Sequence, residues 1–166
     1  RQAFAAVVSD QPTQAQAWWG LGLVESEREH IRAARRLLAQ ALAHDPLLSK
    51  ASAELAAAET LAGDTRAASQ LLDELLAREP ANYVALTARG IGQLQTGQAR
   101  EALANFMKAG LIEPRYARAW LYSGIAFYQL GERQRAVEAF ARAAELDPRD
   151  PAPHQIESVV HEDALQ

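Results

Sequence analysis

The sequence predicts an all-α protein built from four consecutive antiparallel helix hairpins. Prolines recur in a frame of 34 residues, and each ends a helix because it lacks the backbone N–H that the next turn would need. Large apolar residues recur at i, i+4 and i+7 within each period, as one buried helical stripe requires. The intervening segments are rich in Ala, Leu, Glu, Gln and Arg, which favour helix over strand. The prolines in this frame are Pro12, Pro46, Pro80, Pro114 and Pro148.

The two helices of each expected hairpin cross at small residues. A small residue on each helix lets the two backbones approach closely. Between them lies a turn at Gly63, Gly97 or Gly131, because glycine tolerates the positive φ that closes a helix end. The first period carries Glu29 and His30 instead, so we expect a more strained or differently shaped turn there. The small residues are Gly22, Ala56, Gly90 and Gly124 on the first helices and Ala34, Ala68, Ala102 and Ala136 on the second.

The frame also assigns the two ends of the chain. Phe4 and Val7 fall on the second-helix columns, and Ile156 opens an apolar helical side after a proline-rich break. A terminal helix of this kind can cap a solenoid, or it can begin a further repeat. The expected segments are 1–12, the second helix of a truncated preceding repeat; 13–150, four tandem repeats at 15–48, 49–82, 83–116 and 117–150; and 151–166, a C-terminal capping helix or the start of a further repeat.

The repeat at 117–150 resembles a tetratricopeptide repeat. The family unit has 34 residues with large, small, aromatic and proline positions in a set order. The first two repeats depart from this order, since Ser52 replaces a large residue and Glu25 and Glu59 replace an aromatic one. The resemblance implies a right-handed superhelical α-α solenoid. The matching residues of the fourth repeat are Trp120, Gly124, Phe127, Gly131, Ala136, Phe140, Ala143 and Pro148.

The resemblance further implies that the first helices line a concave groove that binds a partner. The groove positions here are mostly apolar and aromatic, with cations near the edge, and large exposed apolar surfaces usually mark interaction sites. The alternative is that Ile91, Leu94 and Ile125 simply pack between repeats. The expected groove residues are Trp19, Leu23, Lys50, Thr87, Ile91, Arg118, Leu121, Tyr122, Ile125 and Tyr128.

The family's carboxylate clamp of Lys, Asn and Arg is not expected here. Its positions carry Trp19, Leu23, Glu54 and Tyr122, with no Asn. An apolar groove suits an amphipathic helix or an extended hydrophobic segment better.

Two sets of charged residues need a separate interpretation. Glu25 and Glu59 fall inside helices, where we expect solvent or an arginine across the hairpin to satisfy them. A basic stripe at helical spacing in the first repeat predicts a solvated outer face; the alternative is a contact for an acidic partner. The stripe consists of Arg28, Arg32, Arg35 and Arg36.

Composition and motifs argue against several classes of function. A formal net charge of −4 is unlike a general nucleic-acid binder. The absence of cysteine rules out disulfides and thiolate zinc sites, and the four histidines lack zinc-site spacing. No apolar run approaches the roughly 18 residues needed to cross a bilayer. With no phosphate loop or nucleophile elbow either, we expect no enzyme, no metal and no cofactor.

The predicted function is a protein–protein interaction scaffold that binds a peptide, helix or protein in its groove. The alternative is a structural spacer or self-association module of a larger bacterial protein, which would make a homo-oligomer. A bacterial cytoplasmic or periplasmic location is open, and analogy with the family favours the cell envelope.

Overall fold

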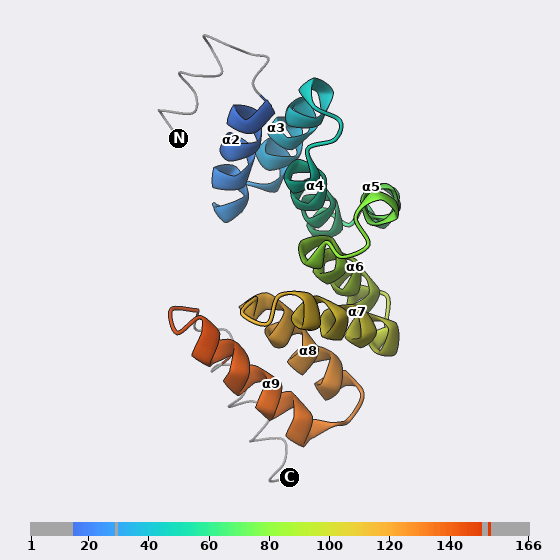
Figure 1. Ribbon diagram of the computed structural model, residues 1–166, viewed down its shortest axis with the longest axis vertical. Coiled ribbons are helices and arrows are strands. Elements are labelled where there is room, and N and C mark those ends of the chain that lie inside the picture. Colours follow the sequence, from blue (N-terminus) through green and yellow to red (C-terminus); the bar gives the residue numbers. More distant parts are fainter. Residues whose placement is uncertain (1–14, 29, 151–152, 154–166) are drawn as a thin grey trace. The chain divides into compact units, whose positions relative to one another are not determined.

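The computed structural model describes residues 15–28, 30–150 and 153. Within these residues the chain is all-α, with eight helices and no strand (Figure 1). Two compact units are present, residues 1–80 and 81–166. No helix among the described residues is long and apolar enough to span a membrane. The predictions for 1–12 and, apart from Pro153, for 151–166 lie outside the described part of the chain.

Unit 1 contains two of the predicted hairpins. Helix α2 pairs with α3 and α4 pairs with α5, and α4 also packs on α3 and contacts α2. The helices are α2 (Ala15–Glu27), α3 (Ile31–His44), α4 (Ser49–Leu61) and α5 (Thr65–Arg78).

Unit 2 repeats this arrangement. Helix α6 pairs with α7 and α8 pairs with α9, while α8 also packs on α7 and contacts α6. The second helix of every hairpin ends two residues before a proline of the 34-residue frame, as predicted. The helices are α6 (Tyr83–Gln95), α7 (Ala99–Ile112), α8 (Ala117–Gln129) and α9 (Arg133–Leu146).

All four hairpin turns are closed by the same backbone hydrogen bond. At the end of α4, Gly63 has φ 83° and the Asp64 N–H donates to the Glu59 carbonyl at 2.9 Å. This is the six-residue closure of a Schellman motif. In the first turn the His30 N–H donates to the Glu25 carbonyl at 3.0 Å. The first turn therefore has the same closing hydrogen bond without a glycine, and the expected difference in shape at Glu29 lies outside the described residues.

The small residues on the first helices make room for aromatic rings. A Cβ placed on Gly124 would lie 2.4 Å from Cε1 of Phe140, and one on Gly90 would lie equally close to Phe106. Both rings are fully buried. The predicted close approach is present, but each glycine faces the large residue of the second helix rather than the alanine four residues before it.

Candidate functional site

Five half-buried side chains lie on the first helices of unit 2, α6 and α8, which contact each other. Each is partly covered by the core and partly open to solvent. All five are apolar or aromatic. We call it the α6–α8 face, and it consists of Ile91, Leu94, Tyr122, Ile125 and Tyr128.

The buried part of each of these side chains packs on the core of unit 2. The rings of Tyr122 and Phe106 are stacked with centroids 5.8 Å apart. Ile91 and Leu94 pack on the cluster that contains Phe106, and Ile125 and Tyr128 pack on the cluster that contains Phe140. The packing interpretation of these residues thus holds for part of each side chain, while the rest of each side chain is exposed to solvent.

Two of the predicted groove residues do not belong to this face. Thr87 is only 1% exposed, and its hydroxyl donates to the Tyr83 carbonyl at 2.9 Å. Leu121 is 9% exposed and belongs to the core cluster of Phe127 and Phe140. Their position in the repeat points toward neighbouring helices rather than solvent, so the expectation that their side chains line an open groove is corrected.

Three further predicted residues, Trp19, Leu23 and Lys50, belong to unit 1. Trp19 and Leu23 are half-buried on α2, and Lys50 is exposed on α4. The Lys50 Nζ atom lies 5.2 Å from the centroid of the Trp19 ring, within the range of a cation–π interaction. Trp19 also packs on the cluster around Leu38. The structure therefore brings Trp19 and Lys50 together, with the Lys50 ammonium group over the Trp19 ring.

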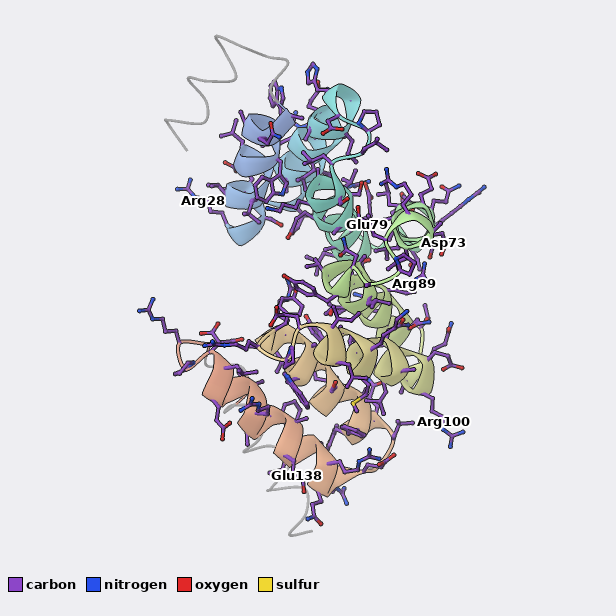
Figure 2. All side chains as sticks on the ribbon, in the orientation of Figure 1. Arg28, Asp73, Glu79, Arg89, Arg100 and Glu138 are labelled. Carbon is purple, nitrogen blue, oxygen red and sulfur yellow. The ribbon has the colours of Figure 1, made fainter. Side chains whose placement is uncertain are left out.

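The charge on the first helices of unit 2 is entirely positive. Helices α6 and α8 carry Arg89 and Arg118 and no carboxylate. Arg89 is labelled in Figure 2. Arg118 is exposed in the first turn of α8, one turn before Tyr122, so the two side chains lie on the same side of the helix. A partner that reaches this face meets apolar side chains with a cation beside them.

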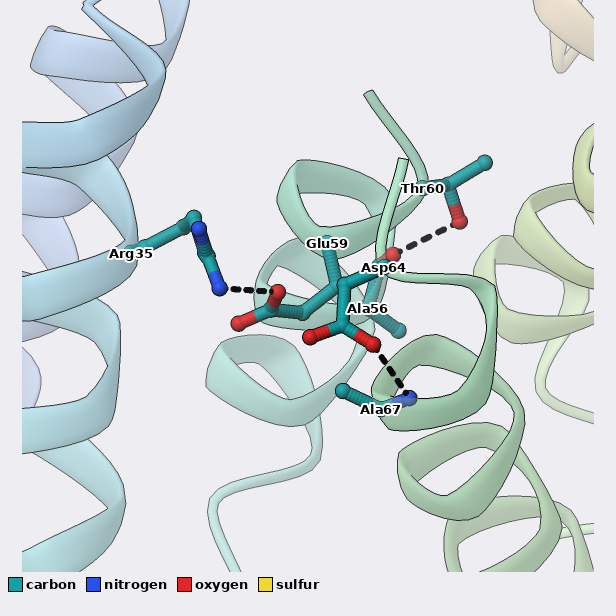
Figure 3. Close-up of polar contacts among 6 residues, drawn as sticks. All are labelled: Arg35, Ala56, Glu59, Thr60, Asp64 and Ala67. Atoms are coloured by element: carbon teal, nitrogen blue, oxygen red, sulfur yellow. Dashed lines mark hydrogen bonds and ion pairs between the residues drawn. The ribbon is translucent and has the colours of Figure 1, made fainter. Parts of the chain in front are cut away.

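Unit 1 contains an ion pair between its two hairpins, and the carboxylate of the pair is buried (Figure 3). Arg35 on α3 lies 2.6 Å from the buried carboxylate of Glu59 on α4. Glu59 raises the pKa of the Arg35 guanidinium above its ordinary value, chiefly by accepting a hydrogen bond. Solvent or an arginine from the other helix of the same hairpin, α5, was expected to satisfy Glu59, but the arginine comes from the preceding hairpin instead.

The basic stripe of the first repeat is therefore divided. Arg28, Arg32 and Arg36 are exposed, as expected for a solvated face, whereas Arg35 is held by the ion pair. The other buried glutamate, Glu25, lies 2.8 Å from Nδ1 of His30. Neither carboxylate belongs to a metal-binding arrangement, since the described residues contain no group of three or more His, Cys, Asp or Glu that could hold a metal ion.

Known proteins of the same architecture support the fold. A structure from work on PilF of Pseudomonas aeruginosa has a TM-score of 0.76 at 22% identity, covering 91% of this chain and 69% of that one. TTC0263, a thermophilic tetratricopeptide repeat protein of Thermus thermophilus, has a TM-score of 0.81 at 22% identity, covering 90% and 82%. MamA from Desulfovibrio magneticus RS-1 has a TM-score of 0.66 at 22% identity, covering 91% and 85%.

Sequence comparison identifies repeats in unit 2. No curated protein sequence matches this chain significantly. The tetratricopeptide repeat family model matches residues 85–151, which span α6 to α9. Repeat proteins of this architecture present extended concave surfaces for binding other molecules. Residues 85–151 are therefore tetratricopeptide repeats, and the chain as a whole has the tetratricopeptide repeat fold.

Proposed function

We propose that this chain is a protein-interaction module that binds an apolar segment of a partner protein on the α6–α8 face. The observation that carries this proposal is the half-exposure of five apolar or aromatic side chains on two contacting helices. Tyrosine provides a large contact area with few rotatable bonds, and it is enriched among the residues that dominate binding energy. Tyr122 and Tyr128 are the expected anchors of the interface.

The chemistry of the face restricts the partner. Ile91, Leu94 and Ile125 would contact apolar side chains, and Arg118 would contact an acidic group at the edge of the segment. The core beneath fixes these side chains, because Tyr122 is stacked on the fully buried Phe106. Less conformational freedom is then lost on binding. The expected ligand is an amphipathic helix or extended segment with a nearby carboxylate.

Selection of peptides from a random phage-displayed library on the intact chain tests this proposal. A double variant, Tyr122→Glu with Ile125→Glu, places two carboxylates on the half-buried face, where an apolar ligand would have to desolvate them. The selected peptides should bind this variant at least about tenfold more weakly, the loss expected of interface anchors. Leu121 is left unchanged because it belongs to the core.

The matched control introduces the same charges elsewhere in unit 2. Gln134 and Ala141 are both exposed on α9, so Gln134→Glu with Ala141→Glu should leave peptide affinity unchanged. Circular dichroism verifies that both variants remain helical. Peptides that bind the α6–α8 variant as tightly as the original chain would contradict the proposal. A concentration-dependent dimer in light scattering that only the α6–α8 variant abolishes would favour the self-association alternative.

A further inference from the structure

The outer side of α7 carries an apolar surface that the other second helices lack. Met107 is 40% exposed and Leu111 is 80% exposed, and exposed Ala104 lies one turn before Met107. These residues share one side of the helix, because they are spaced i, i+3 and i+7. We call them the α7 patch. The residues at the same repeat positions are Arg36, Ala39 and Ala43 in α3, Gln70, Asp73 and Ala77 in α5, and Glu138, Ala141 and Glu145 in α9.

A small apolar notch adjoins the α7 patch. Its volume is about 60 Å³, and Trp120 of α8 forms one wall. The notch exists because Gly110 has no side chain there, whereas the same repeat position is Leu42 in α3 and Leu76 in α5. A Cβ on Gly110 would lie 3.7 Å from the Trp120 ring, an ordinary van der Waals contact, so the space is real. The lining residues are Phe106, Met107, Gly110, Leu111, Trp120 and Ser123.

Charges of both signs lie next to the patch on α7, and the basic ones are nearest to it in helical position. Arg100 precedes Ala104 by one turn and Lys108 follows Met107; both are exposed. Among the described residues, neither forms an ion pair. Figure 2 shows Arg100 extending away from α7. The nearby acidic groups are Glu101, beyond Lys108 around the helix, and Glu113, which accepts a hydrogen bond from a backbone N–H in the following loop.

We propose that the α7 patch docks an amphipathic helix of a partner protein whose apolar side is flanked by Asp and Glu. The stripe from Arg100 to Leu111 extends about 16 Å along α7, at 1.5 Å per residue, which matches three turns of a second helix. One apolar side chain of that helix would enter the notch beside Gly110, as a ridge fits a groove. Its carboxylates would lie near Arg100 and Lys108. This surface is on a second helix, so the proposal does not depend on the α6–α8 face.

Two synthetic peptides of about 18 residues, or five helical turns, provide the test. They share leucines at i, i+4, i+7 and i+11, and their flanking positions are all Glu in one peptide and all Lys in the other. Fluorescence anisotropy with the intact chain should show at least about tenfold tighter binding of the Glu peptide. Leu111→Ser should weaken that binding by about tenfold, as the loss of an interface anchor does. Arg100→Glu with Lys108→Glu should reverse the preference between the peptides.

Two further variants serve as controls. Leu61→Ser removes a similarly exposed leucine, 62% exposed, from unit 1, and it should leave binding unchanged. Gly110→Leu fills the notch and should weaken binding. If Gly110→Leu unfolds the chain, Leu111→Ser still tests the proposal, because Leu111 is exposed and its replacement should not disturb the fold. Equal affinity for the two peptides, or insensitivity to Leu111→Ser, would overturn the proposal. A dimer that Leu111→Ser abolishes would assign the patch to a second copy of the chain and overturn it too.

Discussion

At the scale of single residues, two of the hairpin junctions place one large side chain beside one small residue. Where α7 meets α8, Gly110 lies beside Trp120. At the same repeat positions, where α3 meets α4, Leu42 and Ser52 line one pocket. The bulk is on opposite sides in the two cases, so each of these two junctions has one large and one small residue. Packed cores tolerate such exchanges when the total volume is kept.

Two glycines of unit 2 should respond in opposite ways to the same substitution. Gly124→Ala should destabilise the chain by about 1–3 kcal/mol, because the new Cβ would lie 2.4 Å from the buried Phe140 ring. Gly110→Ala should be neutral or stabilising by up to about 1 kcal/mol, because its Cβ meets only Trp120 at 3.7 Å and alanine favours helix. Urea unfolding monitored by circular dichroism measures both. Equal destabilisation by the two changes would contradict the glycine–aromatic packing.

The residue scale also shows where prediction from sequence fails. Register placed Thr87 and Leu121 on α6 and α8, the helices that carry the α6–α8 face, but it gave no depth of burial. That depth depends on side chains supplied by other helices, such as the Phe127 and Phe140 cluster around Leu121. The notch at Gly110 could have been predicted, since its repeat position is leucine in α3 and α5.

At the scale of elements, the two hairpins of unit 1 are joined by a charged contact. The ion pair of Arg35 and Glu59 links α3 to α4. Glu59 raises the pKa of Arg35 in the folded chain above its value in the unfolded chain. The stability that the charged arginine contributes is therefore fully present below the unfolded-state pKa. It is lost only as the pH rises through the higher folded-state pKa. Both values are strongly alkaline, so titration of Arg35 should cause no change in stability around neutral pH.

A double-mutant cycle should reveal what the pair does. Arg35→Met leaves the buried Glu59 carboxylate without its cation, so this single change should destabilise the chain strongly. Adding Glu59→Leu removes the stranded charge, and the double variant should be more stable than Arg35→Met alone. Thermal unfolding of the four proteins completes the cycle. A double variant less stable than Arg35→Met would show that the carboxylate stabilises α4 through other contacts.

Most of the elements could be predicted because their signals are local. The proline frame gave the ends of α3, α5, α7 and α9, and the turn glycines gave three of the four hairpin turns. The first turn was the exception, since its closing hydrogen bond from His30 to Glu25 forms without a glycine. Helices α2 and α3 pack on each other as the helices of the other hairpins do, and the closing hydrogen bond is kept without the glycine.

At the scale of the whole molecule, the chain consists of two compact units with cores of their own. The described clusters around Leu38 and Leu21 lie in unit 1, and those around Phe106 and Phe140 lie in unit 2. In repeat proteins each hairpin is stabilised mainly by its neighbours, so local changes need not spread along the chain.

The three tryptophans allow the units to be followed separately. Trp120→Phe leaves fluorescence from Trp18 and Trp19 in unit 1, whereas changing those two to Phe leaves only Trp120 in unit 2. Gly124→Val, which clashes with Phe140, should lower the urea midpoint reported by Trp120 more than the midpoint reported by unit 1. Identical shifts in both probes would mean that the chain unfolds as one cooperative body.

The architecture followed from the sequence, but the identity of a partner did not, because the face that would bind it is defined only by apolar and aromatic groups. Hydrogen–deuterium exchange of the intact chain with and without a selected peptide tests the binding face most directly. We predict that the peptide slows exchange most strongly in α6 and α8, around Ile91, Tyr122 and Ile125. Protection confined to α7, to α9 or to unit 1 would contradict the assignment of the α6–α8 face as the binding surface.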